Sequence, residues 1–305
     1  MKIIFAGSPN NAASALRILA TSGFDIVGVL TRTDSVQGRK KSIEQTAVAK
    51  VATELGVALF KTNRIDDQAR DWIRNLKPDL GIVVAYGCIL RNDDLEIPPY
   101  GWINLHYSLL PDFPGPAPVQ HAILSGRSET GVTVFRLDEG VDTGDIISAK
   151  RTEIFPGETS GDLLERLSAI GNQLLVETIS DFAGKLASAK PQPKGSAQSV
   201  AFKPTRESAH INITRPALEI ERQIRAMNPE PMAWLHHDGN PIRIHRAAVG
   251  SRVNLASGEL VMEDKQVFLG CGMGTSLKLI EVKPAGKKSM SAQDWYRGLR
   301  EFVVT

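Results

Sequence analysis

The sequence opens with KIIFAGSPNNAASALRILATSG, residues 2–23, and this stretch decides the class of fold. Residues 2–5 form an apolar run of strand length, and the Gly-Ser-Pro of residues 7–9 predicts a turn. After the turn, apolar residues recur at helical spacing until Gly23, namely Ala12, Ala13, Leu16 and Leu19. The stretch therefore predicts a strand, a turn and a helix.

The same alternation repeats along the next part of the chain. Further strands are predicted at residues 26–30, 57–60, 80–85, 102–106, 132–136 and 146–152, and helices at residues 42–55, 66–76 and 159–182. The continuous apolar run at residues 80–85 suits a strand buried on both faces of a parallel sheet. We therefore predict a doubly wound, mostly parallel α/β sheet, whose ligands bind at the carboxyl ends of the strands.

A composition change marks the end of this first domain. Residues 184–203 are rich in Pro, Ser, Ala, Gly and Lys without an apolar period, which is typical of a linker. Beyond them the sequence predicts a helix at 216–227, short strands at 242–244, 260–262, 267–269 and 277–282, and a last helix capped by Ser291. We expect a catalytic domain at 1–186, a linker at 187–205 and a small β-rich domain at 206–305.

Composition and charge exclude several classes of protein. The first apolar run is too short for a signal peptide or a membrane span, so we expect a cytoplasmic protein. The two cysteines lie far apart with no histidine cluster beside them, so we expect neither a metal nor a disulfide framework. Net charge is −1 over residues 1–205 and +3 over residues 206–305. This mildly basic tail fits a phosphate-facing surface and equally an ordinary solvated one.

The stretch INLHYSLLP, residues 103–111, carries the strongest chemical signal. Strand alternation points Asn104 and His106 to the same side, at the end of a buried strand. The glycine-broken acidic loop 138–145 follows, and a carboxylate from it can return against the imidazole. Amide, imidazole and carboxylate suit acyl transfer to an amine, because attack on a formamide builds an oxyanion and releases a proton. The alternative is that both side chains satisfy backbone groups at a strand end.

These residues resemble the signature of folate-dependent formyltransferases. The resemblance rests on Asn104-Leu-His106, Ser108-Leu-Leu-Pro111 and Asp142-Thr-Gly-Asp145, and it places the catalytic trio on Asn104, His106 and Asp142. Within that superfamily, four further segments resemble the methionyl-tRNA formyltransferases, at residues 5–9, 84–90, 118–121 and 129–133. The segments at 225–229 and 284–292 are similar to the carboxyl-terminal domain of the same family, so the resemblance covers nearly the whole chain.

The resemblance implies a Rossmann-like domain that binds 10-formyltetrahydrofolate, followed by an OB-fold-like β-barrel that helps to hold tRNA. It places the folate contacts on Ala85, Tyr86, Gly87, Cys88, Ile89, Leu90, Ser108, Leu109, Leu110, Pro111 and Asp138. For Tyr86 and Cys88, packing at a strand end is the alternative. We expect the backbone of residues 85–90 to pair with the edge of a pterin.

The resemblance also implies initiator methionyl-tRNA as the acceptor, and we expect the enzyme to be a monomer. A basic loop after the second strand carries Arg39, Lys40 and Lys41, and the resemblance favours it as a clamp on the acceptor stem over an ordinary solvated loop. In the tail domain we take Arg243, Arg246, Lys287 and Lys288 as candidate tRNA contacts.

Two segments depart from the family pattern. Pro114 stands where an arginine is usual, and Asn10-Asn11 replaces an aromatic residue and a proline in the first loop. Alternatives are an amino-sugar N-formyltransferase, a formyl-folate hydrolase and a non-catalytic tRNA-binding relative. A dinucleotide-dependent oxidoreductase is disfavoured, since residues 7–12 lack the Gly-x-Gly-x-x-Gly loop.

Overall fold

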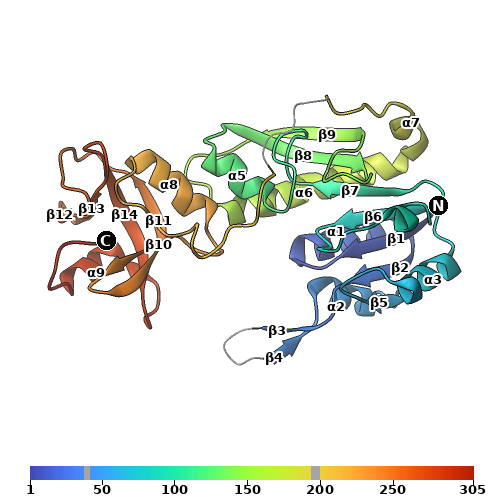
Figure 1. The fold of residues 1–305 in the computed structure, drawn as a ribbon, viewed down its shortest axis with the longest axis horizontal. Helices are drawn as coiled ribbons and strands as arrows, with labels where there is room; N and C mark the ends of the chain where they lie inside the picture. Colours follow the sequence, from blue (N-terminus) through green and yellow to red (C-terminus); the bar gives the residue numbers. More distant parts are fainter. Residues whose placement is uncertain (38–41, 194–199) are drawn as a thin grey trace. The chain divides into compact units, whose positions relative to one another are not determined.

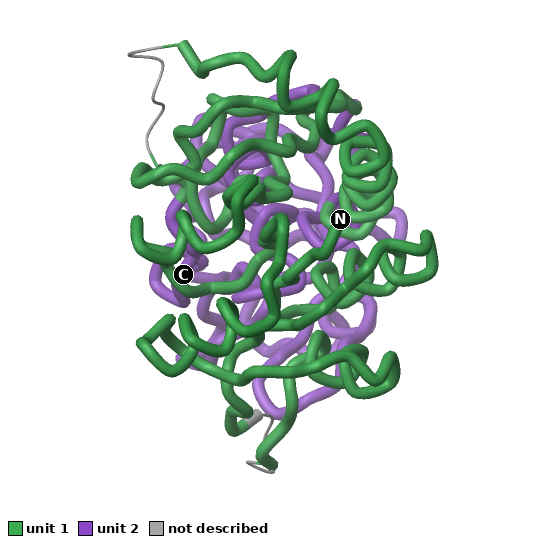
Figure 2. Tube along the Cα trace, turned by 90° about the vertical axis from the view of Figure 1, so that its right-hand side faces the viewer, with its two compact units in different colours: residues 1–118, 130–152, 164–201 green, residues 119–129, 153–163, 202–305 purple. Residues whose placement is uncertain are grey.

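The computed structural model describes residues 1–37, 42–193 and 200–305. The described chain divides into two compact units (Figure 2). Unit 1 comprises residues 1–118, 130–152 and 164–201, and unit 2 comprises residues 119–129, 153–163 and 202–305. Two short segments that precede residue 164 thus cluster with the tail, which the sequence did not indicate.

A seven-stranded sheet forms the centre of unit 1 (Figure 1). Its strands, in spatial order, are β5 (Leu59–Lys61), β2 (Asp25–Thr31), β1 (Lys2–Gly7), β6 (Leu80–Val84), β7 (Trp102–His106), β8 (Glu129–Arg136) and β9 (Ile146–Glu153). The pairs from β5 to β7 are parallel, and β8 runs antiparallel to β7. The order of winding reverses between β1 and β6, where such sheets bind their ligands. This confirms the predicted doubly wound, mostly parallel sheet.

The helices of unit 1 are α1 (Asn10–Thr21), α2 (Ala47–Glu54), α3 (Asp67–Leu76), α4 (Asn92–Leu95), most of α6 (Ser160–Ser180) and α7 (Phe182–Ala187). Helix α5 (Pro118–Leu124) falls in unit 2 from its second residue onward. The first turn depends on Gly7, because a Cβ there would lie 2.7 Å from Ala12 Cβ and 2.8 Å from the Val84 carbonyl oxygen. Only glycine lets β1 and α1 approach so closely.

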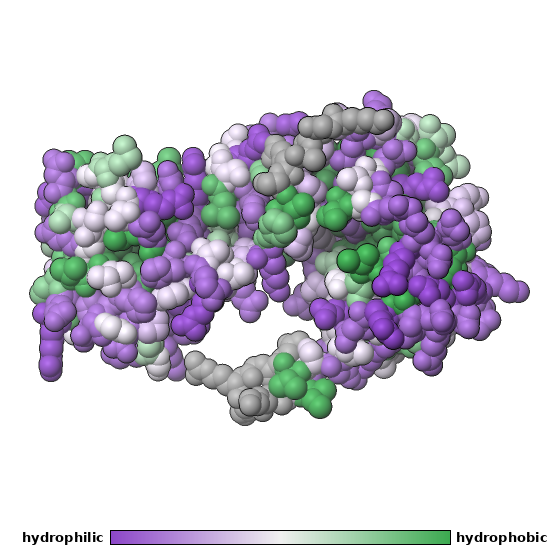
Figure 3. All heavy atoms as spheres, viewed as in Figure 1, coloured by the Kyte–Doolittle hydropathy of each residue, from purple (hydrophilic) through white to green (hydrophobic). Residues whose placement is uncertain are grey.

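One predicted helix was wrong at its start. Residues 42–44 form strand β4 (Ser42–Glu44), which pairs antiparallel with β3 (Ser35–Gln37), and the helix begins only at Ala47. The Thr46 side chain caps it by accepting a hydrogen bond from the Ala49 N–H. Val36 and Ile43, which pair across this hairpin, are 61% and 74% exposed, and apolar surface is visible there in Figure 3.

Unit 2 is built on an antiparallel sheet. Its strands are β10 (Trp234–His237), β11 (Asn240–Val249), β14 (Ser276–Pro284), β13 (Gln266–Gly270) and β12 (Leu260–Glu263), in spatial order, with β15 (Met290–Ser291) beside β14. Helices α8 (Ala217–Ala226) and α9 (Ala292–Arg297) accompany it, and Ser291 caps α9 as predicted. Between the strands described, no pairing joins β12 to β10, so the antiparallel sheet is confirmed without a closed barrel.

Candidate functional site

Strand β7 carries two of the three predicted catalytic side chains. Asn104 pairs with Val83 in β6 and with Phe135 in β8, so it lies in the middle of the sheet next to the winding reversal. His106 follows two residues later on the same face and is 5% exposed. The local apolar pattern thus places a half-buried amide and a buried imidazole on one side of β7, near its carboxyl end.

The His106 ring lies between two acceptors. Its Nε2 atom is 3.0 Å from the Phe113 carbonyl oxygen, and its Nδ1 atom is 3.6 Å from Asp142 Oδ2. The first distance is a hydrogen bond, and the second is an ion-pair distance beyond hydrogen-bond range. Burial lowers the pKa of His106, whereas the Asp142 carboxylate and the Phe113 carbonyl oppose that shift. The two neighbours thus favour the protonated ring, and burial disfavours it.

Hydrogen bonds hold both the side chain and the backbone of Asp142. It has a positive φ of 55°, and its Oδ2 accepts a 2.7 Å hydrogen bond from the Gly115 N–H. The Gln192 side chain donates to the carbonyl oxygens of Asp142 and Gly144, at 2.8 Å each. Asp142 and His106 are 36 positions apart in the printed sequence, so only the folded chain brings the carboxylate against the imidazole.

Asn104 completes the cluster from the strand side. Its side-chain oxygen is buried, and among the residues that the structure describes it has no hydrogen-bond partner. Buried amide groups are normally paired. An amide left open beside a buried imidazole is a suitable hydrogen-bonding group for a reacting ligand.

Sequence reasoning missed the part that residues 113–115 and 192 play in this site. The segment around Pro114 was singled out only as a departure from the family pattern, yet its backbone contacts both His106 and Asp142. The Pro114 carbonyl oxygen also accepts a 2.6 Å hydrogen bond from the Ala201 N–H. The one local signal was a glycine between two prolines, which predicts a sharply bent backbone.

The predicted pterin loop follows β6, beside the winding reversal. Ala85 and Gly87 have φ angles of 46° and 82°. Exposure alternates along the loop: Ala85, Gly87 and Ile89 are exposed, while Tyr86 is buried. The Tyr86 hydroxyl and the Cys88 thiol both lie near the Thr62 carbonyl oxygen, at 3.4 and 3.9 Å. Tyr86 thus packs inward, Cys88 is half-buried, and the residues at the alternate positions are exposed.

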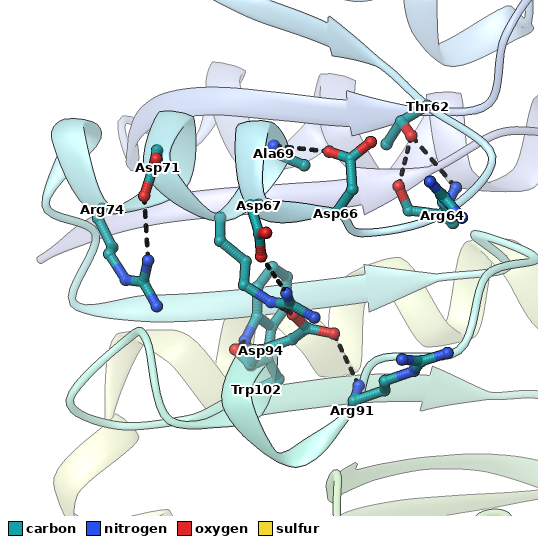
Figure 4. A network of polar contacts seen from close by, with 11 residues as sticks. Thr62, Arg64, Asp66, Asp67, Ala69, Asp71, Arg74, Arg91, Asp94 and Trp102 are labelled. Carbon is teal, nitrogen blue, oxygen red and sulfur yellow. Dashed lines mark hydrogen bonds and ion pairs between the residues drawn. The ribbon is translucent and has the colours of Figure 1, made fainter.

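A buried polar network anchors the far end of this loop (Figure 4). Asp94 in α4 is fully buried; its carboxylate accepts 2.7 Å and 2.8 Å hydrogen bonds from Arg70 Nε and the Arg91 N–H. The indole N–H of Trp102 donates to the Asp94 carbonyl oxygen at 2.8 Å. The network joins α3, α4 and β7, so it fixes the segment on which the loop ends.

The remaining residues that are predicted to contact folate lie directly after β7 and in the acidic loop 138–145. Ser108 is buried, and its hydroxyl donates to the Asp112 carbonyl oxygen at 2.5 Å. Leu110 is buried as well, and its N–H donates to Thr133 Oγ1. Asp138 is exposed, where it accepts hydrogen bonds within its own loop from the Gly140 N–H and the Thr143 hydroxyl. Contact of these residues with folate stays a prediction.

Of the predicted tRNA contacts, Arg39, Lys40 and Lys41 lie outside the described residues. Arg243 and Arg246 are exposed on β11, and Lys287 and Lys288 are exposed between β14 and β15. Among the described residues, no helix is long and apolar enough to cross a bilayer. Likewise, no group of three or more His, Cys, Asp or Glu side chains in that part of the chain is arranged to hold a metal ion.

An amide, an imidazole and a carboxylate at the carboxyl edge of a doubly wound sheet are suited to a class of group-transfer enzyme that stabilises an oxyanion. A family model described as formyl transferase matches residues 1–179, and one for the formyl transferase carboxyl-terminal domain matches residues 203–300. The chain belongs to the methionyl-tRNA formyltransferase family, because relatives of that name match it over nearly their whole length. They include proteins from Leifsonia xyli, 40% identical, and Thermobifida fusca, 42% identical, each aligned over 98% of this chain and 97% of its own.

Solved structures show the same fold at lower identity. An N-formyltransferase from Helicobacter canadensis, in complex with folinic acid and dTDP-3-aminofucose, has a TM-score of 0.68 at 20% identity and covers 92% of this chain and 98% of its own. HypX from Aquifex aeolicus, in complex with tetrahydrofolic acid, has a TM-score of 0.60 at 16% identity. It covers 98% of this chain and 47% of its own. Both neighbours were therefore solved with folate derivatives.

Proposed function

We propose that this protein transfers the formyl group of 10-formyltetrahydrofolate to the α-amino group of methionine on initiator tRNA. One observation of the structure carries the proposal. A buried imidazole lies between a carboxylate and a backbone carbonyl, beside a buried amide oxygen without a protein partner. The acceptor is inferred from the relatives, since proteins about 40% identical over 98% of this chain carry the name methionyl-tRNA formyltransferase.

The proposed chemistry is direct attack of the amine on the formyl carbon. The new C–N bond forms as the carbonyl oxygen gains negative charge. The N–H₂ group of the Asn104 amide stabilises that charge by a hydrogen bond, and the positive charge of the His106 imidazolium, whose ring nitrogens face Phe113 and Asp142, stabilises it electrostatically. The Asp142 carboxylate favours the charged imidazole and assists removal of the proton from the attacking nitrogen. The bond from carbon to N10 of the folate then breaks, and N10 takes up a proton.

In this proposal, one part of the chain binds folate and the other part helps to bind tRNA. Residues 1–186 bind folate through the backbone of residues 85–90 and carry out the reaction. Residues 206–305 help to hold the tRNA, and residues 187–205 join the two. The folate contacts of residues 108–111 and 138, and the clamp at residues 39–41, belong to the same proposal.

A single-turnover assay with formyl-labelled 10-formyltetrahydrofolate tests the reaction. Initiator methionyl-tRNA should take up label, and elongator methionyl-tRNA should take up far less. The proposal fails if label reaches water instead of the amine, because the protein would then be a hydrolase. It also fails if the protein retains initiator tRNA without turnover, because that result describes a non-catalytic binder.

An amino-sugar acceptor is the remaining alternative. The N-formyltransferase from Helicobacter canadensis, solved with dTDP-3-aminofucose, has the same fold at 20% identity, whereas the methionyl-tRNA formyltransferases reach about 40%. The higher identity over both domains favours the tRNA acceptor. Adding a nucleotide-linked amino sugar to the same assay separates the two, since each acceptor captures the label in a product of different size.

A further inference from the structure

Three exposed arginines follow strands β2, β5 and β6 at the carboxyl edge of the sheet in unit 1. Arg32 comes directly after β2, Arg64 comes three residues after β5, and Arg91 directly follows the loop 85–90 that leads out of β6. In Figure 4, the guanidinium groups of Arg64 and Arg91 both lie at the end toward which the strands point. We call Arg32, Arg64 and Arg91 the arginine rim.

The side chain of Arg32 lies directly beside the loop 85–90. A Cβ added to Gly87 would be 3.4 Å from Arg32 Cδ and 3.7 Å from its Nη1 atom. Arg32 Nε donates a 3.2 Å hydrogen bond to Asn63 Oδ1, which fixes the direction of the side chain. Burial raises the pKa of the Cys88 thiol, whereas the Tyr86 hydroxyl and the charge of Arg32 oppose that shift. The positive charge of Arg32 thus acts on the loop.

The backbones of the other two rim residues are fixed next to the same loop. Thr62 Oγ1 donates to the Arg64 carbonyl oxygen at 2.5 Å, and the Thr62 carbonyl oxygen accepts a 3.4 Å hydrogen bond from the Tyr86 hydroxyl. The Arg91 N–H donates to Asp94 Oδ2 at 2.8 Å. These hydrogen bonds use backbone atoms of Arg64 and Arg91, so their guanidinium groups can reach a ligand that extends from the loop.

The positive charge of the arginine rim is not neutralised by ion pairs. Asp34 pairs with Lys61 at 2.7 Å, and Asp67 and Asp94 pair with Arg70 at 2.8 and 2.7 Å. In the part of the chain that the structure describes, no acidic side chain makes an ion pair with a rim arginine. Guanidinium groups bind carboxylate and phosphate oxygens through paired N–H donors. The rim therefore favours an anionic ligand.

The extent of the rim suits a ligand with several carboxylates. Strands β5, β2, β1 and β6 are neighbours in that order, and at about 4.8 Å per strand β5 and β6 are about 14 Å apart. A single carboxylate cannot contact cations over such a length. Folate carries an aminobenzoyl ring and a glutamate tail, and its polyglutamate forms gain one carboxylate with each added residue. Ile89, 87% exposed in the same loop, offers an apolar surface to the ring.

We propose that the arginine rim binds the glutamate tail of the folate co-substrate, so that the protein selects polyglutamylated 10-formyltetrahydrofolate. This inference rests on the proposed function, because that function supplies the folate. It adds three residues that were not among the predicted folate contacts, and it names the form of the co-substrate. A phosphate group of RNA is the competing occupant. The folate tail is favoured because Arg32 packs against Gly87, in the loop that is proposed to bind the pterin.

Binding of tetrahydrofolate with one or with five glutamates to the full chain, measured by calorimetry without tRNA, tests the rim. An exposed ion pair changes a binding constant by about 1.4- to 5-fold, so three pairs should favour the pentaglutamate by about 3- to 100-fold. This preference should decrease as salt is raised, because exposed charges are screened. Equal affinities of the wild-type protein for the two ligands would overturn the inference.

The triple variant Arg32→Gln/Arg64→Gln/Arg91→Gln should lose the preference, and its affinities for the two ligands should agree within about 2-fold. All three side chains are exposed, so we expect the variant to fold, and thermal unfolding checks this. If it does not fold, the double variant Arg64→Gln/Arg91→Gln keeps the contact between Arg32 and Asn63 and should still lose most of the preference. A preference that stays at the wild-type value in these variants would overturn the inference.

The matched control is Lys2→Gln/Arg74→Gln/Lys77→Gln. These exposed residues lie at the start of β1 and at the end of α3, and Figure 4 shows Arg74 at the opposite end from the rim. The change in net charge is the same, and the control should keep the wild-type preference for the pentaglutamate. An equal loss in both triple variants would overturn the inference, because net charge would then explain the binding. Weaker tRNA binding by the rim variant with its preference among folates intact would overturn it in favour of an RNA contact.

The failure of the proposed function is distinguishable from the failure of this inference. If the wild-type protein prefers the pentaglutamate through the rim and transfers no formyl group to methionyl-tRNA, the proposed reaction is wrong and the rim stands. If it formylates methionyl-tRNA and binds both folates equally, the reaction stands and the rim is wrong.

Discussion

Replacement of Asp142 by asparagine is the sharpest test of the candidate active site. Asparagine keeps the shape of the side chain, tolerates the positive φ of 55° at this position, and can still accept the hydrogen bond from the Gly115 N–H. What it removes is the negative charge 3.6 Å from His106 Nδ1. Asp142→Ala would add backbone strain to the lost charge, so it is the less informative change.

The expected loss follows from that distance. Two unit charges 3.6 Å apart interact by about 5 kcal/mol at an effective dielectric constant of about 20. Asp142 has a side chain that is 15% exposed, and solvent reduces this value, so we expect the barrier to rise by about 3 to 5 kcal/mol. Each factor of ten in rate corresponds to about 1.4 kcal/mol, so turnover should fall by roughly 10² to 10⁴. The free energy of unfolding should change by only about 1 kcal/mol, because one hydrogen bond weakens and none is lost.

The assay is single-turnover formylation of initiator methionyl-tRNA as a function of pH, with thermal unfolding measured alongside. Asp142 raises the pKa of His106, so its neutralisation lowers that pKa and leaves less imidazolium at any given pH. The limb of the pH–rate profile that reports His106 should therefore move to lower pH in the variant. Asp145→Asn is the control, because it makes the same change at an exposed position of the same loop. A rate within tenfold of wild type, or an unmoved limb, would refute the assignment.

Three further changes test other parts of the protein. Arg39→Gln/Lys41→Gln should raise KM for methionyl-tRNA, and the slope of log KM against log salt should decrease by about 1.4. Loss of folate binding in this variant would contradict the clamp. Asp94→Asn leaves buried donors without a carboxylate, so thermal unfolding should show a loss of about 1 to 3 kcal/mol, and KM for folate should rise more than kcat falls. Gly81→Ala places a Cβ 2.1 Å from the ring of Trp102, and it should destabilise the fold by about 1 to 3 kcal/mol or more in the same unfolding measurement.

Much of the fold followed from local patterns in the chain. Apolar period and turn residues predicted β7 at its observed bounds, Trp102–His106, and the cap of α9 at Ser291, because such features depend on residues a few positions apart. The helix expected from residue 42 shows the limit of this reasoning. Residues 42–44 pair as a strand with residues 35–37, although their apolar residues are spaced as in a helix. The spacing of apolar residues along the chain does not show which segments will pair.

The sequence by itself determined the alternating α/β order and the side chains available for catalysis, since strand alternation alone puts Asn104 and His106 on one side. Only the tertiary structure decided that Asp142 and the backbone of residues 113–115 would meet His106, and that Gln192 would hold the loop behind them. The physical reason is separation along the chain. Contacts between distant segments depend on how the loops close and on which strands pair.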